Sequence, residues 1–82
     1  MNVHALKTWP EAFQDVWDRR KTFEIRWNDC GFALGDLVIL QEFVPVAGEY
    51  TGREIIARIV HLEIGTWGLP ATLAVFGIDI IA

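Results

Sequence analysis

The order of hydrophobic and polar residues along the chain predicts one strand, one helix and then four further strands. Apolar residues alternate with polar ones in a half-buried strand, whereas apolar residues three and four positions apart form one face of a helix. Gly, Pro, Asn and Asp residues separate the apolar segments and indicate turns. The expected strands span residues 3–7, 22–26, 37–43, 53–63 and 72–81.

The helical pattern lies in "WPEAFQDVWDRR" and predicts a helix from about Trp9 to Arg19 or Arg20. Thr8 and Glu11 have the spacing of a capping box, so we expect them to begin this helix. Its apolar stripe, which should face the core, is formed by Phe13, Val16 and Trp17.

The segment "TFEIR" after the helix has the two-residue period of a strand. Phe23 and Ile25 point to one side and Glu24 and Arg26 to the other, because successive side chains of a strand face opposite ways. We therefore expect Phe23 and Ile25 to face the core. The charged side is either a solvated face with weak ion pairs or the floor of a binding site.

Short loops between consecutive strands imply antiparallel pairing, and the fold class is α+β, mainly β. A small and very apolar sheet removes its exposed edges by closing into a barrel. The chain of 82 residues has no internal repeat or linker, so we expect a single domain over residues 1–82. The expected architecture is a small β-barrel of about five to six strands with one N-terminal helix at one opening.

Composition and charge narrow the function classes. The chain is 52% hydrophobic, which excludes a disordered protein. Its net charge of −4 argues against a protein that coats long nucleic acid through a broad basic surface, but it leaves room for a local basic cleft.

Cysteine and hydropathy patterns point to a reducing, aqueous compartment. The single cysteine, Cys30, cannot form an internal disulfide, and two distant histidines do not make a zinc site, so no metal or cofactor is expected. No apolar stretch reaches membrane-spanning length, and the first residues lack the pattern of a signal peptide. We expect a cytoplasmic protein that does not bind membranes.

Lys21, Glu24 and Arg26 have the spacing of the signature Gly-x-Lys-x-x-Glu-x-Arg, with Arg19 at the position of the glycine. Together with "HALK", "FALGD" and "GEYTGRE", this segment resembles the ASCH superfamily, which is PUA-like, and within it a subgroup of short bacterial and phage proteins of unassigned function. If the glycine ends a helix in left-handed conformation, Arg19 should hold a positive φ, or the helix should end at Arg20 or Lys21.

The resemblance implies a PUA-like barrel with a cleft beside the helix that accepts RNA, a nucleotide or a modified nucleoside. Lys21, Glu24 and Arg26 would line this cleft. Side chains expected at its rim are Lys7, Asn28 and Arg53. Trp27 and Trp67 lie in expected loops and are the candidates for stacking on a base, or they only pack. Trp9 and Trp17 are expected to be packing residues.

Two other functions stay open. Some ASCH members hydrolyse N4-acetylcytidine with a lysine, a threonine and a glutamate. Lys21 matches that lysine, but Glu24 occupies the threonine position and the segment with the glutamate is missing, so an enzyme is the weaker prediction. The third possibility is a phage-type interaction protein, with a homodimer or a host protein as partner, that sequesters a nucleotide signal or blocks a host enzyme.

Overall fold

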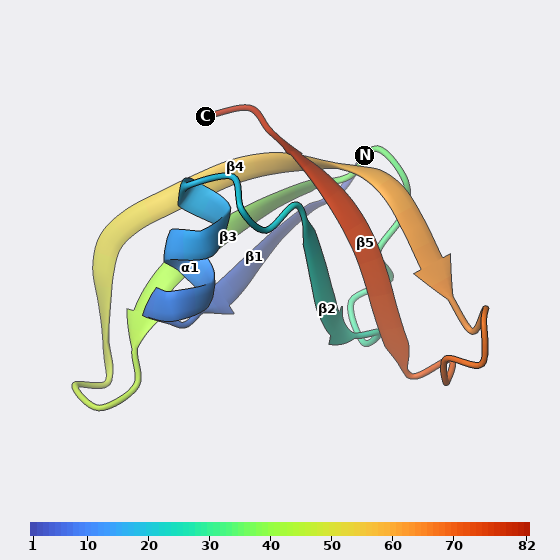
Figure 1. Cartoon of the computed structure of the whole chain (residues 1–82), viewed down its shortest axis with the longest axis horizontal. Helices are drawn as coiled ribbons and strands as arrows, with labels where there is room; N and C mark the ends of the chain where they lie inside the picture. Colours follow the sequence, from blue (N-terminus) through green and yellow to red (C-terminus); the bar gives the residue numbers. More distant parts are fainter.

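The computed structural model describes residues 1–82 as one curled sheet with a single helix against its concave side (Figure 1). All five expected strands and the helix are present, so the predicted order of elements is confirmed. The elements are β1 (Val3–Thr8), α1 (Pro10–Trp17), β2 (Phe23–Trp27), β3 (Leu37–Val44), β4 (Glu49–Ile64) and β5 (Leu73–Ile80). No helix in the chain is long and apolar enough to cross a membrane.

The five strands form one sheet in the order β1-β3-β4-β5-β2. Three strand pairs are antiparallel, as expected, whereas β1 and β3 run parallel. No backbone ladder joins the two edge strands, β1 and β2, so the sheet is a half-barrel and the predicted closed barrel is wrong (Figure 1). We call the gap between β1 and β2 the seam.

The sheet curls because β4 is long enough to pair with β3 along one part and with β5 along the other. The first part of its 16 residues pairs with β3 and the second part pairs with β5. The register shifts in both ladders, between Gln41 and Phe43 and between Ile59 and His61. Such irregularities bend a strand and increase its twist, which brings β1 and β2 toward each other without pairing them.

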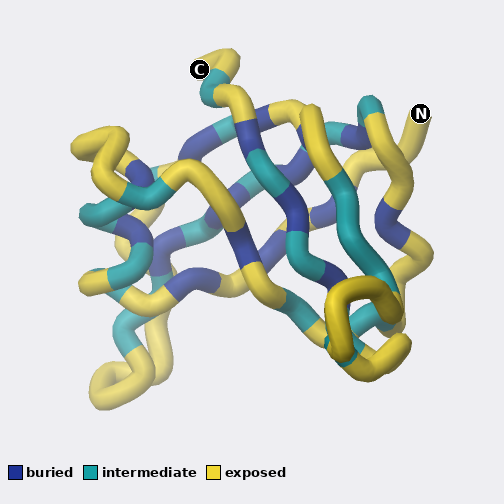
Figure 2. Tube along the Cα trace, turned by 45° about the vertical axis from the view of Figure 1, so that its right-hand side comes forward, coloured by how far each residue is buried: buried dark blue, intermediate teal, exposed yellow.

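The core lies between the concave face of the sheet and α1 (Figure 2). Phe13 and Val16 of the helix are completely buried, as their spacing predicts. Trp17 is 42% exposed, so its prediction as a core residue is wrong. The helix ends at Trp17, and this last residue contacts only the edge of the core, with its ring 5.8 Å from that of Phe13.

The predicted facing of β2 is wrong. Phe23 is 44% and Ile25 is 54% exposed, whereas Glu24 is 2% exposed. Glu24 lies opposite Phe76 of β5 in the ladder, and Phe76 is completely buried on the concave face. Directly opposed residues share a face, so the pairing turns the carboxylate inward and the two apolar residues outward.

The start of α1 also departs from the expectation. Trp9 is the N-cap residue, and no side chain caps the helix. Thr8 belongs to β1, and its hydroxyl donates to the carbonyl of Leu6. The predicted capping box is therefore wrong, because the strand runs directly into the helix through an extended residue before Pro10.

The end of α1 confirms one prediction. Arg19 has a φ of 60°, the left-handed conformation expected for the residue at the position of the signature glycine. The amide of Arg19 donates to the carbonyl of Val16, and the amide of Arg20 donates to the carbonyl of Asp15. These two bonds form a Schellman motif, which ends the helix at Trp17, two or three residues earlier than predicted, and turns the chain toward β2.

Candidate functional site

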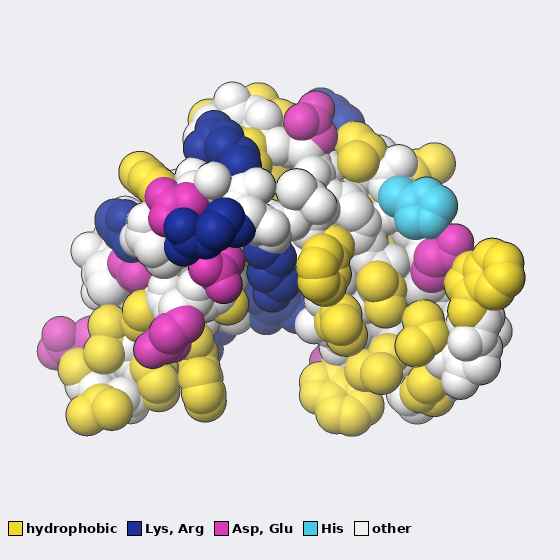
Figure 3. All heavy atoms as spheres, in the orientation of Figure 1, with side chains coloured by type: hydrophobic (Ala, Val, Ile, Leu, Met, Phe, Trp, Pro, Cys, Tyr) yellow, Lys and Arg dark blue, Asp and Glu magenta, His cyan; other side chains and the backbone are white.

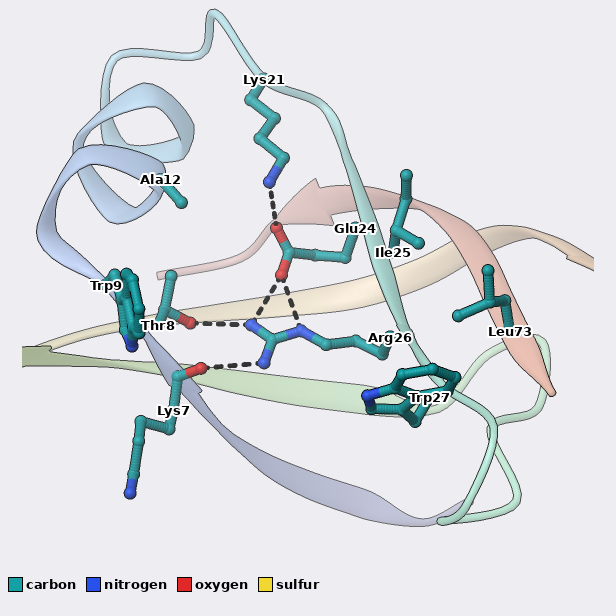
Figure 4. A pocket seen from close by; sticks show the side chains of 10 residues that line it. All are labelled: Lys7, Thr8, Trp9, Ala12, Lys21, Glu24, Ile25, Arg26, Trp27 and Leu73. Atoms are coloured by element: carbon teal, nitrogen blue, oxygen red, sulfur yellow. Dashed lines mark hydrogen bonds and ion pairs between the residues drawn. The ribbon is translucent and has the colours of Figure 1, made fainter. Parts of the chain in front are cut away.

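The largest cavity of the protein, about 440 Å³, lies at the seam beside α1 (Figure 4). Figure 3 shows lysine and arginine side chains at the back of the hollow and hydrophobic side chains along the rim formed by the β2 and β5 side. We call it the main cavity. Its lining residues are Lys7, Thr8, Trp9, Ala12, Lys21, Glu24, Ile25, Arg26, Trp27 and Leu73.

Glu24 forms the centre of the charged floor. Its Oε1 accepts hydrogen bonds from Arg26, at 3.1 Å from Nε and 2.8 Å from Nη2. Its Oε2 lies 3.2 Å from Lys21 Nζ, but this ion pair lacks hydrogen-bond geometry and Oε2 accepts no hydrogen bond. A buried carboxylate requires hydrogen-bond donors or cations next to its oxygens, because removing it from water without such compensation costs free energy. Arg26 therefore compensates the buried carboxylate with two hydrogen bonds, whereas Lys21 compensates it by charge alone.

Arg26 crosses the seam and joins the two edge strands through its side chain. Nη1 donates to the backbone carbonyl of Lys7 at 2.8 Å, and Nη2 donates to the hydroxyl of Thr8 at 3.0 Å (Figure 4). Its bonds to Glu24 hold the guanidinium in the plane needed for both contacts. A side chain therefore replaces the backbone ladder that would close a barrel at this point.

Lys21 reaches the cavity because of the helix exit. Its backbone amide donates to the carbonyl of Asp15 at 3.0 Å, next to the Schellman motif. Its ammonium carries three donors, and its only charged partner is Glu24. With 28% of the side chain exposed, Lys21 keeps donors for a ligand in the cavity.

The chain matches a family described as domain of unknown function (DUF3850) over residues 3–78. It belongs to that family. No curated protein matches the chain. The family description assigns no activity, so the motif resemblance to the ASCH superfamily stays a prediction.

The walls of the cavity in this DUF3850 domain are aromatic and apolar. Trp9 and Trp27 lie on opposite sides of the Glu24–Arg26 pair (Figure 4). Trp9 is 59% and Trp27 is 68% exposed, so each indole offers surface that no protein group covers. Exposed indole faces beside a polar floor suit a flat ring with polar edges.

Three of the other predicted site residues do not contribute to the charged floor. Figure 4 shows the ammonium of Lys7 directed away from the charged floor, and it lies 4.2 Å from the centre of the Phe43 ring, so Lys7 lines the cavity without pointing its charge into it. Asn28 donates its backbone amide to the carbonyl of Thr72 and lines no cavity. Trp67 is 88% exposed on a loop.

Arg53 does not reach the cavity either. Its guanidinium binds Glu42 at 2.9 and 3.0 Å and donates to Gln14 of α1 at 3.0 Å. The pairing raises the pKa of Arg53 and lowers that of Glu42. The "YTGR" segment therefore fixes the helix to the sheet.

The "FALGD" segment also has a structural role. Asp36 is buried, with Oδ2 at 2.8 Å from His4 Nε2 and 3.1 Å from the amide of Ala33. Its Oδ1 accepts from the amide of Asn2 at 3.0 Å. These bonds, the one with His4 above all, lower the pKa of Asp36. They tie the start of β1 to the start of β3.

Trp9 and Thr8 line the main cavity but were not predicted for the candidate site. Both were assigned to the start of the helix. The signal that could have found them is Pro10, because the residue before a proline favours an extended conformation. An extended Trp9 continues the line of β1 to the cavity, next to Lys7.

The remaining titratable groups were compared with the geometry of metal sites and of cysteine nucleophiles. No group of three or more His, Cys, Asp or Glu residues is placed to hold a metal ion. The thiol of Cys30 donates to Asp29 Oδ1 at 3.1 Å, and this hydrogen bond raises the pKa of Cys30. The raised pKa reduces the thiolate fraction, which is the nucleophilic form.

Proposed function

We propose that this domain binds a nucleotide-like ligand, either free or as part of single-stranded RNA, in the main cavity. The observation that carries the proposal is the inward-facing Glu24, which holds Lys21 and Arg26 in place between two exposed indoles. The volume of about 440 Å³ lies within the range of about 300–1,000 Å³ typical of small-molecule sites.

The aromatic walls supply affinity for a base. Stacking on an aromatic side chain contributes about 1–3 kcal/mol per base and tolerates different bases. Trp9 and Trp27 offer such faces on two sides of the cavity. A ribose or an aliphatic ligand would gain less from them, since neither presents a flat π-face.

The charged floor supplies orientation. Lys21 has unused donors, and Nη1 of Arg26 carries two hydrogens but donates only one, to Lys7. A ligand with two acceptor oxygens, such as a carbonyl oxygen and a phosphate oxygen, would accept from each donor separately, because the Glu24 carboxylate lies between Lys21 and Arg26 (Figure 4). The acidic chain, with a net charge of −4, disfavours wide contact with long RNA, so a short segment or a free nucleotide fits best.

The test is a thermal-shift screen against nucleosides, nucleotides and short single-stranded RNAs, followed by titration of tryptophan fluorescence. A ligand that prefers the folded state raises the melting temperature. Trp9→Ala and Trp27→Ala should each weaken binding by about 1–3 kcal/mol. Trp67→Ala is the matched control, because Trp67 is exposed and lines no cavity. Equal affinity in all three variants would contradict the proposal.

The same samples test the hydrolase alternative. Thr8 is the threonine nearest the charged floor, but its hydroxyl donates to Leu6 and accepts from Arg26, so it is not free as a nucleophile. We expect N4-acetylcytidine to remain intact when incubated with the protein. Release of cytidine, measured by chromatography and lost in Lys21→Ala, would replace the binding proposal by a hydrolase.

A further inference from the structure

The seam contains a second cavity, of about 240 Å³, next to the main one. Lys7, Arg26 and Trp27 line both cavities, and all three belong to the edge strands β1 and β2. The remaining lining of the second cavity is Ala5, Leu6, Asp29, Cys30 and Phe32. The seam is thus one groove, which the side chain of Arg26 divides where it crosses from β2 to β1.

The second cavity is too small to be an independent site, since typical ligand pockets begin at about 300 Å³. Its polar group also differs from that of the main cavity. Asp29 has one oxygen bound to the thiol of Cys30, and its other oxygen has no hydrogen-bond partner. A free carboxylate oxygen accepts from an amino group and repels a phosphate, so the second cavity suits an amino-bearing base better than a phosphate.

We propose that the seam binds two consecutive nucleotides of a single strand, one base in the main cavity and the next in the second cavity. This inference rests on the proposed function and specifies its ligand as a phosphodiester-linked pair. Trp27 is the only aromatic residue that lines both cavities, so it can contact both bases. The linking phosphate would lie at the divide, where Arg26 Nη1 keeps an unused N–H.

The charges along the groove support this arrangement, with a base in each cavity and the phosphate between them. Arg26 lines both cavities and Lys21 lines only the main one, whereas the carboxylate Asp29 lines only the second cavity. The ammonium of Lys7, which also lines both, lies over the Phe43 ring instead. A phosphodiester carries one charge and fits between the two cavities. A terminal phosphate in the second cavity would face Asp29 directly.

The experiment compares cytidine monophosphate, the dinucleotide CpC and the trinucleotide CpCpC by tryptophan fluorescence, with RNA and DNA versions of each. We expect CpC to bind at least about tenfold more tightly than the mononucleotide, because one additional base is stacked. The third nucleotide should add less than about twofold, since the cavity of about 170 Å³ that shares Lys21 with the main cavity has no aromatic residue in its lining on which a base could stack. CpC should also bind more tightly than UpU, which lacks the amino groups that Asp29 would accept from.

Cys30 reports which cavity is occupied. It is exposed, free and the only cysteine, so its alkylation rate follows access to the second cavity. Saturating CpC should slow alkylation several-fold, whereas saturating cytidine monophosphate should not. Ala5→Phe, which places a ring in the second cavity from an exposed position of β1, should lower the affinity for CpC to that for the mononucleotide.

The outcomes separate the two proposals. Equal affinity for CpC and the mononucleotide, with no protection of Cys30, would overturn the two-nucleotide groove and leave the nucleotide-binding function in place. Affinity that keeps rising with each added nucleotide would also overturn it. Failure of every ligand to bind would overturn both.

Discussion

Glu24 in β2 and Glu42 in β3 are both inward-facing carboxylates held by an arginine, but only Glu24 borders a cavity. Glu24 is 2% exposed and Glu42 is 6% exposed, so both lose nearly all contact with water. They differ in how many of their oxygens accept hydrogen bonds and in which side chains surround the carboxylate.

Both oxygens of Glu42 accept hydrogen bonds. Its Oε1 accepts from Thr51 at 2.7 Å and from Arg53 Nε at 2.9 Å, and its Oε2 accepts from Arg53 Nη2 at 3.0 Å. The guanidinium carbon of Arg53 lies 4.9 Å from the centres of the Phe13 and Trp17 rings of α1. This cluster is a clamp between helix and sheet, with aromatic faces already occupied by a cation.

Glu24 is also a buried carboxylate bound by an arginine, but its hydrogen bonding is incomplete and it lies beside a cavity. One of its oxygens accepts no hydrogen bond, Lys21 keeps unused donors, and the neighbouring indoles have no cation stacked on them. A closed network stabilises the fold, whereas an open one with spare donors beside a cavity is available to a ligand. From this comparison we expect Arg53 to contribute mainly to stability, and we propose that Lys21 and Arg26 contribute to binding.

The largest effect expected from this difference is on stability at Arg53. Arg53→Ala removes both bonds to Glu42 and leaves that carboxylate buried without its cation, so the melting temperature should fall by on the order of 10 °C. Calorimetry measures the shift, and Arg20→Ala, which removes an exposed cation, is the control. Ligand affinity should stay within about twofold of the parent. If Arg53→Ala lost as much affinity as Lys21→Ala, Arg53 would also contribute to binding, and the expected difference between the two regions would be wrong.

The opposite pattern is expected at Lys21. Lys21→Ala should weaken ligand binding by about 1–3 kcal/mol, because the ligand loses a charge-assisted hydrogen bond. The melting temperature without ligand should fall less than in Arg53→Ala, since Lys21 makes a single ion pair. Titration calorimetry and thermal unfolding on the same samples check both halves. Unchanged affinity would favour a solvated charged face at β2.

The periodicity of the sequence was sufficient to predict the strands and the helix, but not to predict which side chains of each strand face the core. The five strands and the helix follow from the alternation of residues, yet β2 is reversed, because alternation alone places Phe23 and Ile25 inside. Pairing with β5 turns Glu24 inward, and only Lys21 and Arg26 make that position tolerable. Local rules fail most often at functional sites, so the reversed strand is itself an indication of one.

The candidate site was predictable only where the motif is local. Lys21, Glu24 and Arg26 lie within six residues and meet in the cavity. Arg53 could not be placed from sequence, because its position depends on the bend of β4. For Trp9 the sequence signal is Pro10, which favours an extended residue before it. Barrel closure likewise depends on contacts between strands far apart in the chain, which periodicity does not contain.

A smaller effect is expected from acid. The pKa of Glu42 is lowered by Arg53 and that of Asp36 is lowered by His4. A lowered pKa in the folded state stabilises the protein above the unfolded value of about 4, and this contribution is lost as the pH falls through the folded value. Urea unfolding should therefore show decreasing stability below about pH 4. Glu42→Gln and Asp36→Asn should each flatten that decrease, and an unchanged slope would contradict the assignment.

The smallest effect concerns Arg19, which lies on the turn that brings Lys21 to the cavity. Its φ of 60° is unfavourable for a residue with a Cβ, although its side chain partly compensates by donating to the carbonyl of Trp17 at 2.7 Å. Arg19→Gly should stabilise the protein by about 0.5–1 kcal/mol, because glycine adopts this conformation freely. Arg19→Ala, which loses the same hydrogen bond but keeps the Cβ, is the matched control and should not stabilise. Ligand affinity should not change in Arg19→Gly, since the Schellman bonds are made by backbone amides and still direct Lys21 toward Glu24. A loss of stability in the glycine variant, measured by urea unfolding, would show that the Arg19 side chain, and not its backbone, determines the helix exit.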